Sequence, residues 1–132
     1  MKRKAIVASL DEWFSKYVRL SNAHDNGMVN CFTCGVYQKW NDRIDAGHFQ
    51  TRSKYSTRWD EMNVKPQCKR CNMTNGGQQY TFGIRLDQIY GQGTAANILR
   101  KSNELSKFTN SELLAMRDDF KAQVKQMLKD LE

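Results

Sequence analysis

The sequence predicts an α+β fold in which a small zinc-stapled core is flanked by helices and followed by a long C-terminal helix. Two Cys-x-x-Cys pairs, Cys31/Cys34 and Cys68/Cys71, lie in a polar stretch over residues 31–77. That stretch has few aliphatic residues, so a metal is expected to hold it together. Apolar residues recur at helical spacing on both sides of it. The length of 132 residues suits one domain, or one domain with a helical appendage.

The four cysteines give the most specific signal. Zn²⁺ in structural sites takes a closed tetrahedron of soft ligands, which two Cys-x-x-Cys pairs supply. A redox Cys-x-x-Cys would not explain two copies, and disulfides belong mainly to exported proteins. The N-terminus, MKRKAIVASLDEW, lacks the apolar segment of a signal peptide. We therefore expect structural Zn²⁺ and a cytoplasmic location.

The charge balance points to an acidic partner. The formal net charge is +7 and the isoelectric point is about 9.4. Four ionised thiolates and one Zn²⁺ would leave the chain basic. Basic proteins of this size often bind nucleic acid, although charge alone does not name the partner. No apolar run is long enough to span a membrane, so a membrane is not an expected partner.

Helical signals flank the cysteine-rich core. Ser9 and Glu12 fit a capping box that opens a helix over residues 9–21. A second capping box, Thr109 with Glu112, opens the C-terminal helix. Pro66 is expected only to fix the chain entering the second cysteine pair. The other expected elements are strands over 29–32, 36–40 and 43–49, a polar loop over 51–55, and helices from near Cys71, over 78–90 and over 94–99.

The C-terminal helix carries two rows of side chains. The apolar row consists of Leu113, Met116, Phe120, Val124, Met127 and Leu131. The basic row consists of Arg117, Lys121, Lys125 and Lys129 and is either a solvated face or a track for a phosphate backbone. Residues 1–100 form the expected core domain. Residues 101–132 are either part of the same compact unit or an appendage for dimerisation or DNA binding.

The loop between the cysteine pairs, together with Asn72 directly after the last cysteine, holds the residues best suited to phosphodiester chemistry. His48 is the best general base, because its ordinary pKa leaves it neutral at cellular pH. Asp45 is a hard oxygen ligand for Mg²⁺ or Mn²⁺, and Asn72 can offer an amide oxygen to the same ion. Asn63 can hold the His48 loop by hydrogen bonds. This residue order resembles that of HNH (ββα-metal) nucleases.

One feature of the spacing opposes this scheme. Residues 45 and 48 of a regular strand point to opposite faces. A bulge or bend at Gly47 is therefore expected, to turn Asp45 and His48 toward one metal. Otherwise Asp60 or Glu61 takes the role of the acidic ligand.

Basic residues are frequent in the sequence around His48, and some of them must offset the negative charge of the four cysteine thiolates. Trp40 and Trp59 are expected to be small-core residues rather than base-stacking ones. The candidate DNA contacts are Arg43, Arg52, Lys54 and Arg58, with Lys121 and Lys125 on the C-terminal helix.

Five stretches together resemble one known family. They are LDEWFSKYVRL at 10–20, CFTCG at 31–35, DAGHFQTR at 45–52, TRWDEMNVKPQCKRCN at 57–72 and QYTFGIRLDQIYG at 79–91. The chain resembles the phage NinG (Rap) recombination protein family of HNH-like, structure-specific endonucleases.

This resemblance implies a metal-dependent endonuclease that acts on branched DNA such as Holliday junctions and D-loops. The location would then be the cytoplasm of the bacterial host. His48, Asn63 and Asn72 would form the HNH-type constellation. A homodimer is also expected, because two incisions on a junction are easiest with two active sites.

Two other functions remain open at this point. The zinc-stapled core and basic helix could form a nucleic-acid-binding module that does not cut. Alternatively, the apolar row of the C-terminal helix could bind another protein.

Overall fold

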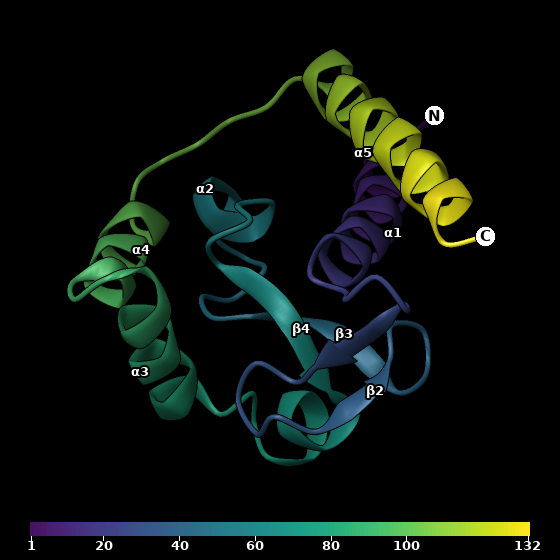
Figure 1. Cartoon of the computed structure of the whole chain (residues 1–132). Coiled ribbons are helices and arrows are strands. Elements are labelled where there is room, and N and C mark those ends of the chain that lie inside the picture. Colours follow the sequence, from purple (N-terminus) through teal and green to yellow (C-terminus); the bar gives the residue numbers. More distant parts are fainter.

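Two short antiparallel strand pairs occupy the middle of the fold, and helices lie on either side of them (Figure 1). The computed structural model describes all residues, 1–132. Its elements are α1 (Arg3–Ser21), β1 (Met28–Asn30), β2 (Tyr37–Lys39), β3 (Ile44–His48), α2 (Tyr55–Arg58), β4 (Val64–Cys68), the π-helical turn η1 (Arg70–Thr74), α3 (Gln79–Tyr90), α4 (Thr94–Ser102) and α5 (Asn110–Asp130). The expected α+β class with a long C-terminal helix is therefore confirmed.

Strands β3 and β4 pair without interruption, from Ile44 opposite Cys68 to His48 opposite Val64. The turn η1 follows β4 directly, so the middle of the chain has a strand, strand, helical-turn order. Strand β4 was not expected, and it contains Pro66. The Pro66 carbonyl accepts a hydrogen bond from Phe32 N at 2.8 Å. In an antiparallel strand the N and C=O of one residue face the same edge, so the proline nitrogen also points away from β3.

Helix α1 begins at Arg3, six residues before the expected start, and the Ser9 capping box is wrong. Ile6 is buried and extends the row formed by Leu10, Phe14 and Val18 by one turn. This burial favours helix over the N-terminal residues as well. Ser9 lies inside the helix, and its Oγ accepts a hydrogen bond from Arg117 of α5 at 3.1 Å.

Helix α5 lies along α1, as Figure 1 shows at the upper right. Its capping box is confirmed: Thr109 Oγ1 accepts from Glu112 N, and Glu112 Oε1 accepts from Thr109 N. Leu113 and Val124 of its apolar row are fully buried. Phe120 packs against Phe14 at 5.0 Å between ring centroids. Helix α5 thus packs on α1, and most of its apolar row is covered by this chain's own helix.

The remaining boundaries differ in small ways. Helix α4 is preceded by Gly93 at the N-cap, not Thr94, and runs to Ser102. A single helical turn, α2, follows the loop at 51–54, where no helix was expected. None of the helices is both long and apolar enough to cross a membrane.

Three separate clusters of buried side chains stabilise the fold. The largest lies between α1, β4 and α5 and includes Trp59, which is therefore a core residue. The second surrounds the cysteines, and Trp40 packs against it. The third, beneath α3 and α4, contains Phe82, Leu86 and Ile98. The cluster around the cysteines has only two other buried apolar residues, Val29 and Ile44, so it depends on its sulfur atoms.

We predict that Leu113→Ala lowers the free energy of unfolding by about 2–5 kcal/mol, because it opens a cavity between α1 and α5. Leu113 has 0% exposure. Leu105→Ala is the matched control, because Leu105 is 85% exposed and should cost less than about 0.5 kcal/mol. Urea unfolding of both variants measures the difference. Equal losses would show that α5 does not pack on α1 as described.

Candidate metal and active site

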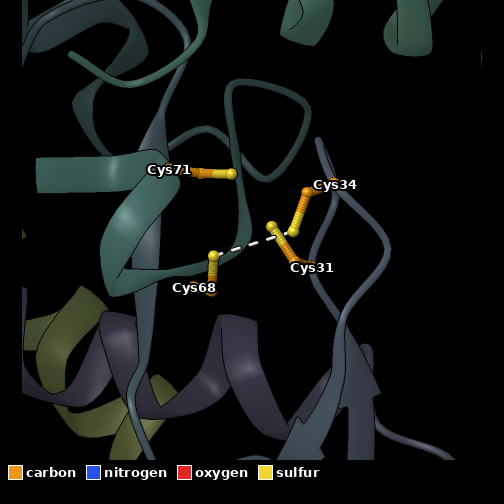
Figure 2. A group of neighbouring side chains, drawn as sticks. All are labelled: Cys31, Cys34, Cys68 and Cys71. Carbon is orange, nitrogen blue, oxygen red and sulfur yellow. Dashed lines mark hydrogen bonds between the residues drawn. The ribbon is translucent and has the colours of Figure 1, made fainter. Parts of the chain in front are cut away.

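The four cysteine sulfurs converge on one point (Figure 2). Cys31 and Cys34 lie at the turn between β1 and β2, Cys68 ends β4, and Cys71 lies in η1. All four sulfurs lie within 4.8 Å of one another, and Cys34 Sγ and Cys68 Sγ are 3.7 Å apart. A tetrahedral zinc ion with Zn–S bonds of ~2.3 Å requires sulfurs roughly 3.8 Å apart. The four side chains therefore fit a zinc ion.

Backbone hydrogen bonds shape the turn that carries the first pair. Gly35 has a φ of +82°, a conformation that favours glycine, and its N–H donates to the Cys31 carbonyl at 2.9 Å. Thr33 Oγ1 lies 3.5 Å from Cys31 Sγ and accepts a hydrogen bond from Gln67 Nε2 at 3.1 Å. Gln67 is fully buried, so it ties this turn to β4.

The thiols have unequal acidities. Burial by itself raises the pKa of Cys31, but backbone N–H groups of Cys68 and Cys34 outweigh it and lower that pKa to about 6. Burial raises the pKa of Cys71 to about 12, and the neighbouring sulfurs add to the rise. Burial also raises the pKa of Cys68. Without a cation the cluster therefore keeps protons that a bound zinc ion would displace.

We predict that the chain binds one zinc ion and that a chelator which removes it unfolds residues 31–77. Circular dichroism and metal analysis measure both effects. Adding Zn²⁺ back should restore the fold, whereas Mg²⁺ should not, because Mg²⁺ prefers oxygen ligands. Zinc affinity should fall as the pH falls, because protons compete for Cys71, Cys68 and finally Cys31. A metal-free chain with an unchanged spectrum would contradict the assignment.

His48 is fixed in one orientation at the end of β3. Its Nε2 lies 2.9 Å from the Arg58 carbonyl oxygen, which can only accept a hydrogen bond. The proton is therefore on Nε2, and the lone pair of Nδ1 remains free. Burial lowers the pKa of His48; the hydrogen bond to Arg58 partly opposes this, and the cationic Arg52 adds to it. His48 is accordingly neutral at cellular pH.

Asn63 holds the chain segment that follows His48. Its Oδ1 accepts from Gln50 N at 2.7 Å, and its Nδ2 donates to the carbonyls of Gln50 and Thr57, both at 3.0 Å. Asn63 is fully buried, so these bonds are shielded from water. The expected hydrogen bonds to the loop after His48 therefore exist, and a part for Asn63 in catalysis stays a prediction.

Asp45 and Asn72 lie side by side. Asp45 Oδ2 accepts from Asn72 Nδ2 at 3.1 Å, and Asp45 Oδ1 accepts from Lys69 Nζ at 2.7 Å. A half-turn of the Asn72 amide would present an oxygen in place of the nitrogen. Two neighbouring ligands of an octahedral Mg²⁺ lie roughly 3.0 Å apart, because each bond is ~2.1 Å. Asp45 and Asn72 therefore fit two positions around a hard divalent ion.

The two alternative acidic ligands lie elsewhere. Asp60 pairs with Lys101 of α4 at 2.6 Å. Glu61 faces Tyr17 of α1, whose pKa is raised to about 12, first by burial and then by this carboxylate. Neither side chain lines the cavity that contains His48.

The bulge expected at Gly47 is absent, because β3 keeps a regular register with β4. Gly47 instead makes room for Gln67: a Cβ at this position would lie 1.9 Å from Gln67 Oε1. Asp45 and His48 nevertheless line one cavity of about 1000 Å³. Strand β3 pairs only with β4, so its other edge is free, and the lining comes from α1, β3, η1 and the loops on either side of β3, among other residues. Side chains on both faces of β3 reach the cavity at this free edge.

Sequence reasoning missed the contribution of Asp11. Its carboxylate accepts two hydrogen bonds from Arg58, at 3.1 and 2.5 Å, and one from Trp59 Nε1 at 2.9 Å. The hydrogen bond to Asp11 raises the pKa of Arg58. The Arg58 carbonyl in turn holds His48. Asp11 thus fixes the backbone that orients His48, and the Arg58 guanidinium, expected at DNA, is bound within the protein.

The other candidate DNA contacts are dispersed. Arg43 and Arg52 line the cavity. Lys54 lies at the N-cap of α2, beside a second, smaller cavity. On α5, Lys121 lies over the Trp13 ring at 5.5 Å, and Lys125 is exposed. Two of the six thus line the cavity that contains His48, and their contacts with DNA remain predictions.

We predict that Asp11→Asn lowers the free energy of unfolding by about 2–4 kcal/mol, because it leaves a half-buried guanidinium without its partner. The Arg58 and Asp11 side chains are only 15% and 21% exposed. Glu12→Gln is the matched control, since Glu12 is 62% exposed and its pair with Lys16 is worth less than about 1 kcal/mol. Thermal unfolding measures both. A loss for Asp11→Asn no larger than the control's would remove the proposed link to His48.

The fold and this site define a class of protein: a small α+β protein with a cluster of four cysteines that fits a zinc ion, and a charged cavity beside it. The family model described as "Bacteriophage Lambda NinG protein" matches residues 1–131, and the chain belongs to this family.

Curated relatives agree with this assignment. The chain is 31% identical to protein ninG of Escherichia phage 933W, and 30% identical to those of Salmonella phage P22 and Escherichia phage lambda. Each match covers 104 residues, which are 76% of this chain and 47% of the relative. The chain thus spans about half the length of the curated relatives it matches. No solved structure matches it.

Proposed function

We propose that this protein is a metal-dependent DNA endonuclease of the HNH type that cuts branched recombination intermediates. The observation that carries the proposal is the state of His48. Its Nε2 is engaged by a backbone carbonyl, its Nδ1 is free, and burial lowers its pKa. It shares one cavity with the Asp45–Asn72 pair. Membership of the NinG family supports a place in phage DNA recombination.

In this proposal His48 is the general base. Its free Nδ1 accepts a proton from the attacking water, and the imidazolium that forms keeps its hydrogen bond to Arg58. The backbone carbonyl stabilises the resulting positive charge. Asn63 keeps the loop from residues 49 to 57 in place, so that the ring does not have to reorganise during the reaction.

Asp45 and Asn72 would hold a Mg²⁺ or Mn²⁺ ion through their side-chain oxygens. When bound, such an ion neutralises charge on the scissile phosphate and on the departing 3′ oxygen. Lys69 now occupies one oxygen of Asp45, and its ammonium can move to the phosphate because the side chain is 58% exposed. Arg43 and Arg52, which also line the cavity, add positive charge where the DNA backbone must pass.

A preference for branched DNA rests on the family resemblance. Two incisions on a four-way junction need two active sites, so a homodimer is part of the proposal. The apolar row of α5 is mostly covered by α1, so any pairing of chains would use another surface.

The second candidate function is a zinc-stapled module that binds nucleic acid without cutting. One observation favours it. The four cysteines are the only group of three or more His, Cys, Asp or Glu side chains close enough to hold a metal ion. A catalytic ion would thus have one carboxylate and one amide from the chain, and water or phosphate oxygens for its other ligands.

A cleavage assay separates the two functions. Wild type, His48→Ala and His24→Ala would each be mixed with a four-way junction, a D-loop and a linear duplex, with and without Mg²⁺ or Mn²⁺. We expect metal-dependent cutting of the branched DNA by wild type and a loss of roughly 10²–10⁴-fold in His48→Ala. His24→Ala removes the chain's other histidine, which hydrogen-bonds Asn30 and does not line the cavity, so this variant should cut normally.

The same assay across pH tests the role of His48. Because its pKa is lowered, the ring stays neutral below its ordinary value of 6.5. The rate should therefore remain high through pH 6.5 and decline only at lower pH. Tight, salt-sensitive DNA binding without cutting under any metal would contradict the endonuclease proposal and support the nucleic-acid-binding module.

A further inference from the structure

Helix α1 forms one wall of the cavity, although it lies outside the stretch that holds the cysteines and His48. Asp11, Phe14, Ser15 and Arg19 all line it. Asp11 marks the His48 end of the cavity, because Asp11 binds the Arg58 side chain and the Arg58 carbonyl contacts His48. Arg19 lies eight residues further along the helix, about 12 Å away at ~1.5 Å per residue. It therefore reaches the other end of the cavity, near the start of β3.

Arg19 is held rigidly without a carboxylate partner. Its Nε donates to the Ser15 carbonyl at 3.1 Å, and its guanidinium lies 5.3 Å from the Trp40 ring centroid. None of the five ion pairs in the chain includes it. Burial lowers the pKa of Arg19, and the charge of Asp45 opposes this only in part. A half-buried cation without a counterion is costly unless an anion binds beside it.

The charges around the cavity also favour an anion. Four cationic side chains line it (Arg19, Arg43, Arg52 and Lys69), together with two carboxylates, Asp11 and Asp45. Both carboxylates are already paired, Asp11 with Arg58 and Asp45 with Lys69. Three arginines thus face the cavity without an ion pair. Arg19 is the one whose guanidinium is fixed by both a backbone carbonyl and an aromatic ring.

We propose that Arg19 binds a DNA backbone phosphate at the end of the cavity opposite His48. This inference deepens the proposed function and rests on DNA being the ligand. Because Arg19 lies about 12 Å along α1 from Asp11, which marks the His48 end, its phosphate belongs to a nucleotide that flanks the one on which His48 acts. The guanidinium is already ordered, so binding costs little side-chain entropy. Arg19 therefore sets the affinity and register of the strand rather than the rate of the chemical step.

The test measures DNA binding by fluorescence anisotropy, with a labelled four-way junction, the zinc-loaded full chain, no added Mg²⁺ and a series of salt concentrations. Arg19→Gln should weaken binding roughly tenfold, as expected for a lost charge-assisted hydrogen bond. It should also reduce the slope of log affinity against log salt by about 1. Arg100→Gln is the matched control, since it removes the same charge from an exposed position on α4.

Three results would overturn the proposal. They are wild-type affinity and slope in Arg19→Gln, an equal loss in Arg100→Gln, or no salt-dependent binding by wild type. If Arg19→Gln loses zinc or its thermal transition, Arg19→Lys takes its place. That variant keeps the charge but loses the planar fork, so binding should weaken while the salt slope stays. Unchanged affinity in Arg19→Lys would then contradict the proposal.

Cleavage is scored separately, so this inference and the nuclease can fail independently. If wild type cuts, Arg19→Gln should raise KM and leave kcat within about twofold of wild type, since Arg19 does not touch the reacting atoms. A fall in kcat at unchanged KM would place Arg19 in the chemistry and refute a flanking phosphate. If wild type binds DNA but never cuts, the endonuclease is lost and the Arg19 phosphate site stands on the binding data.

Discussion

The four-cysteine cluster fixes η1 against the turn between β1 and β2, and the position of Asn72 beside the cavity depends on it. Asn72 directly follows Cys71, so the sulfur cluster decides whether its amide lies next to Asp45. The surrounding buried cluster includes only two other apolar side chains, Val29 and Ile44. Because apolar burial is so small there, a metal bound by the four sulfurs would supply most of the local stability. A zinc ion held by the four cysteines would therefore both stabilise this part of the fold and set the geometry of the site.

A second constraint acts on His48 from the opposite direction. Asp11 in α1 binds Arg58 and Trp59, and the Arg58 carbonyl determines which nitrogen of His48 carries the proton. The buried Asn63 side chain holds the loop between His48 and Arg58 by donating hydrogen bonds to the carbonyls of Gln50 and Thr57. The ring is therefore held by backbone groups whose own positions come from two different parts of the chain. Such doubly supported side chains lose little precision when a ligand binds.

Local patterns predicted the features that depend on nearby residues. The cysteine pairs, the Thr109 capping box and the hydrogen bonds of Asn63 all follow from short-range chemistry or motif order. Features that depend on tertiary packing were not predictable in the same way. Ser9 was expected to cap a helix, but buried Ile6 extends that helix past it. Strand β4 tolerates Pro66 only because that edge faces away from β3.

The pairing of Asp11 with Arg58 shows why the site is larger than its motif. The two residues lie 47 positions apart, and no spacing rule connects them. Yet α1 lines the cavity from the His48 end to Arg19, and α1 is itself held by α5 through Leu113 and Phe120. Helix α5 therefore acts on the site indirectly, because it holds α1, the helix that lines the cavity and packs against β3. A change in α5 that loosens α1 should disturb His48 and Arg19 together, because both ends of the cavity depend on one rigid helix.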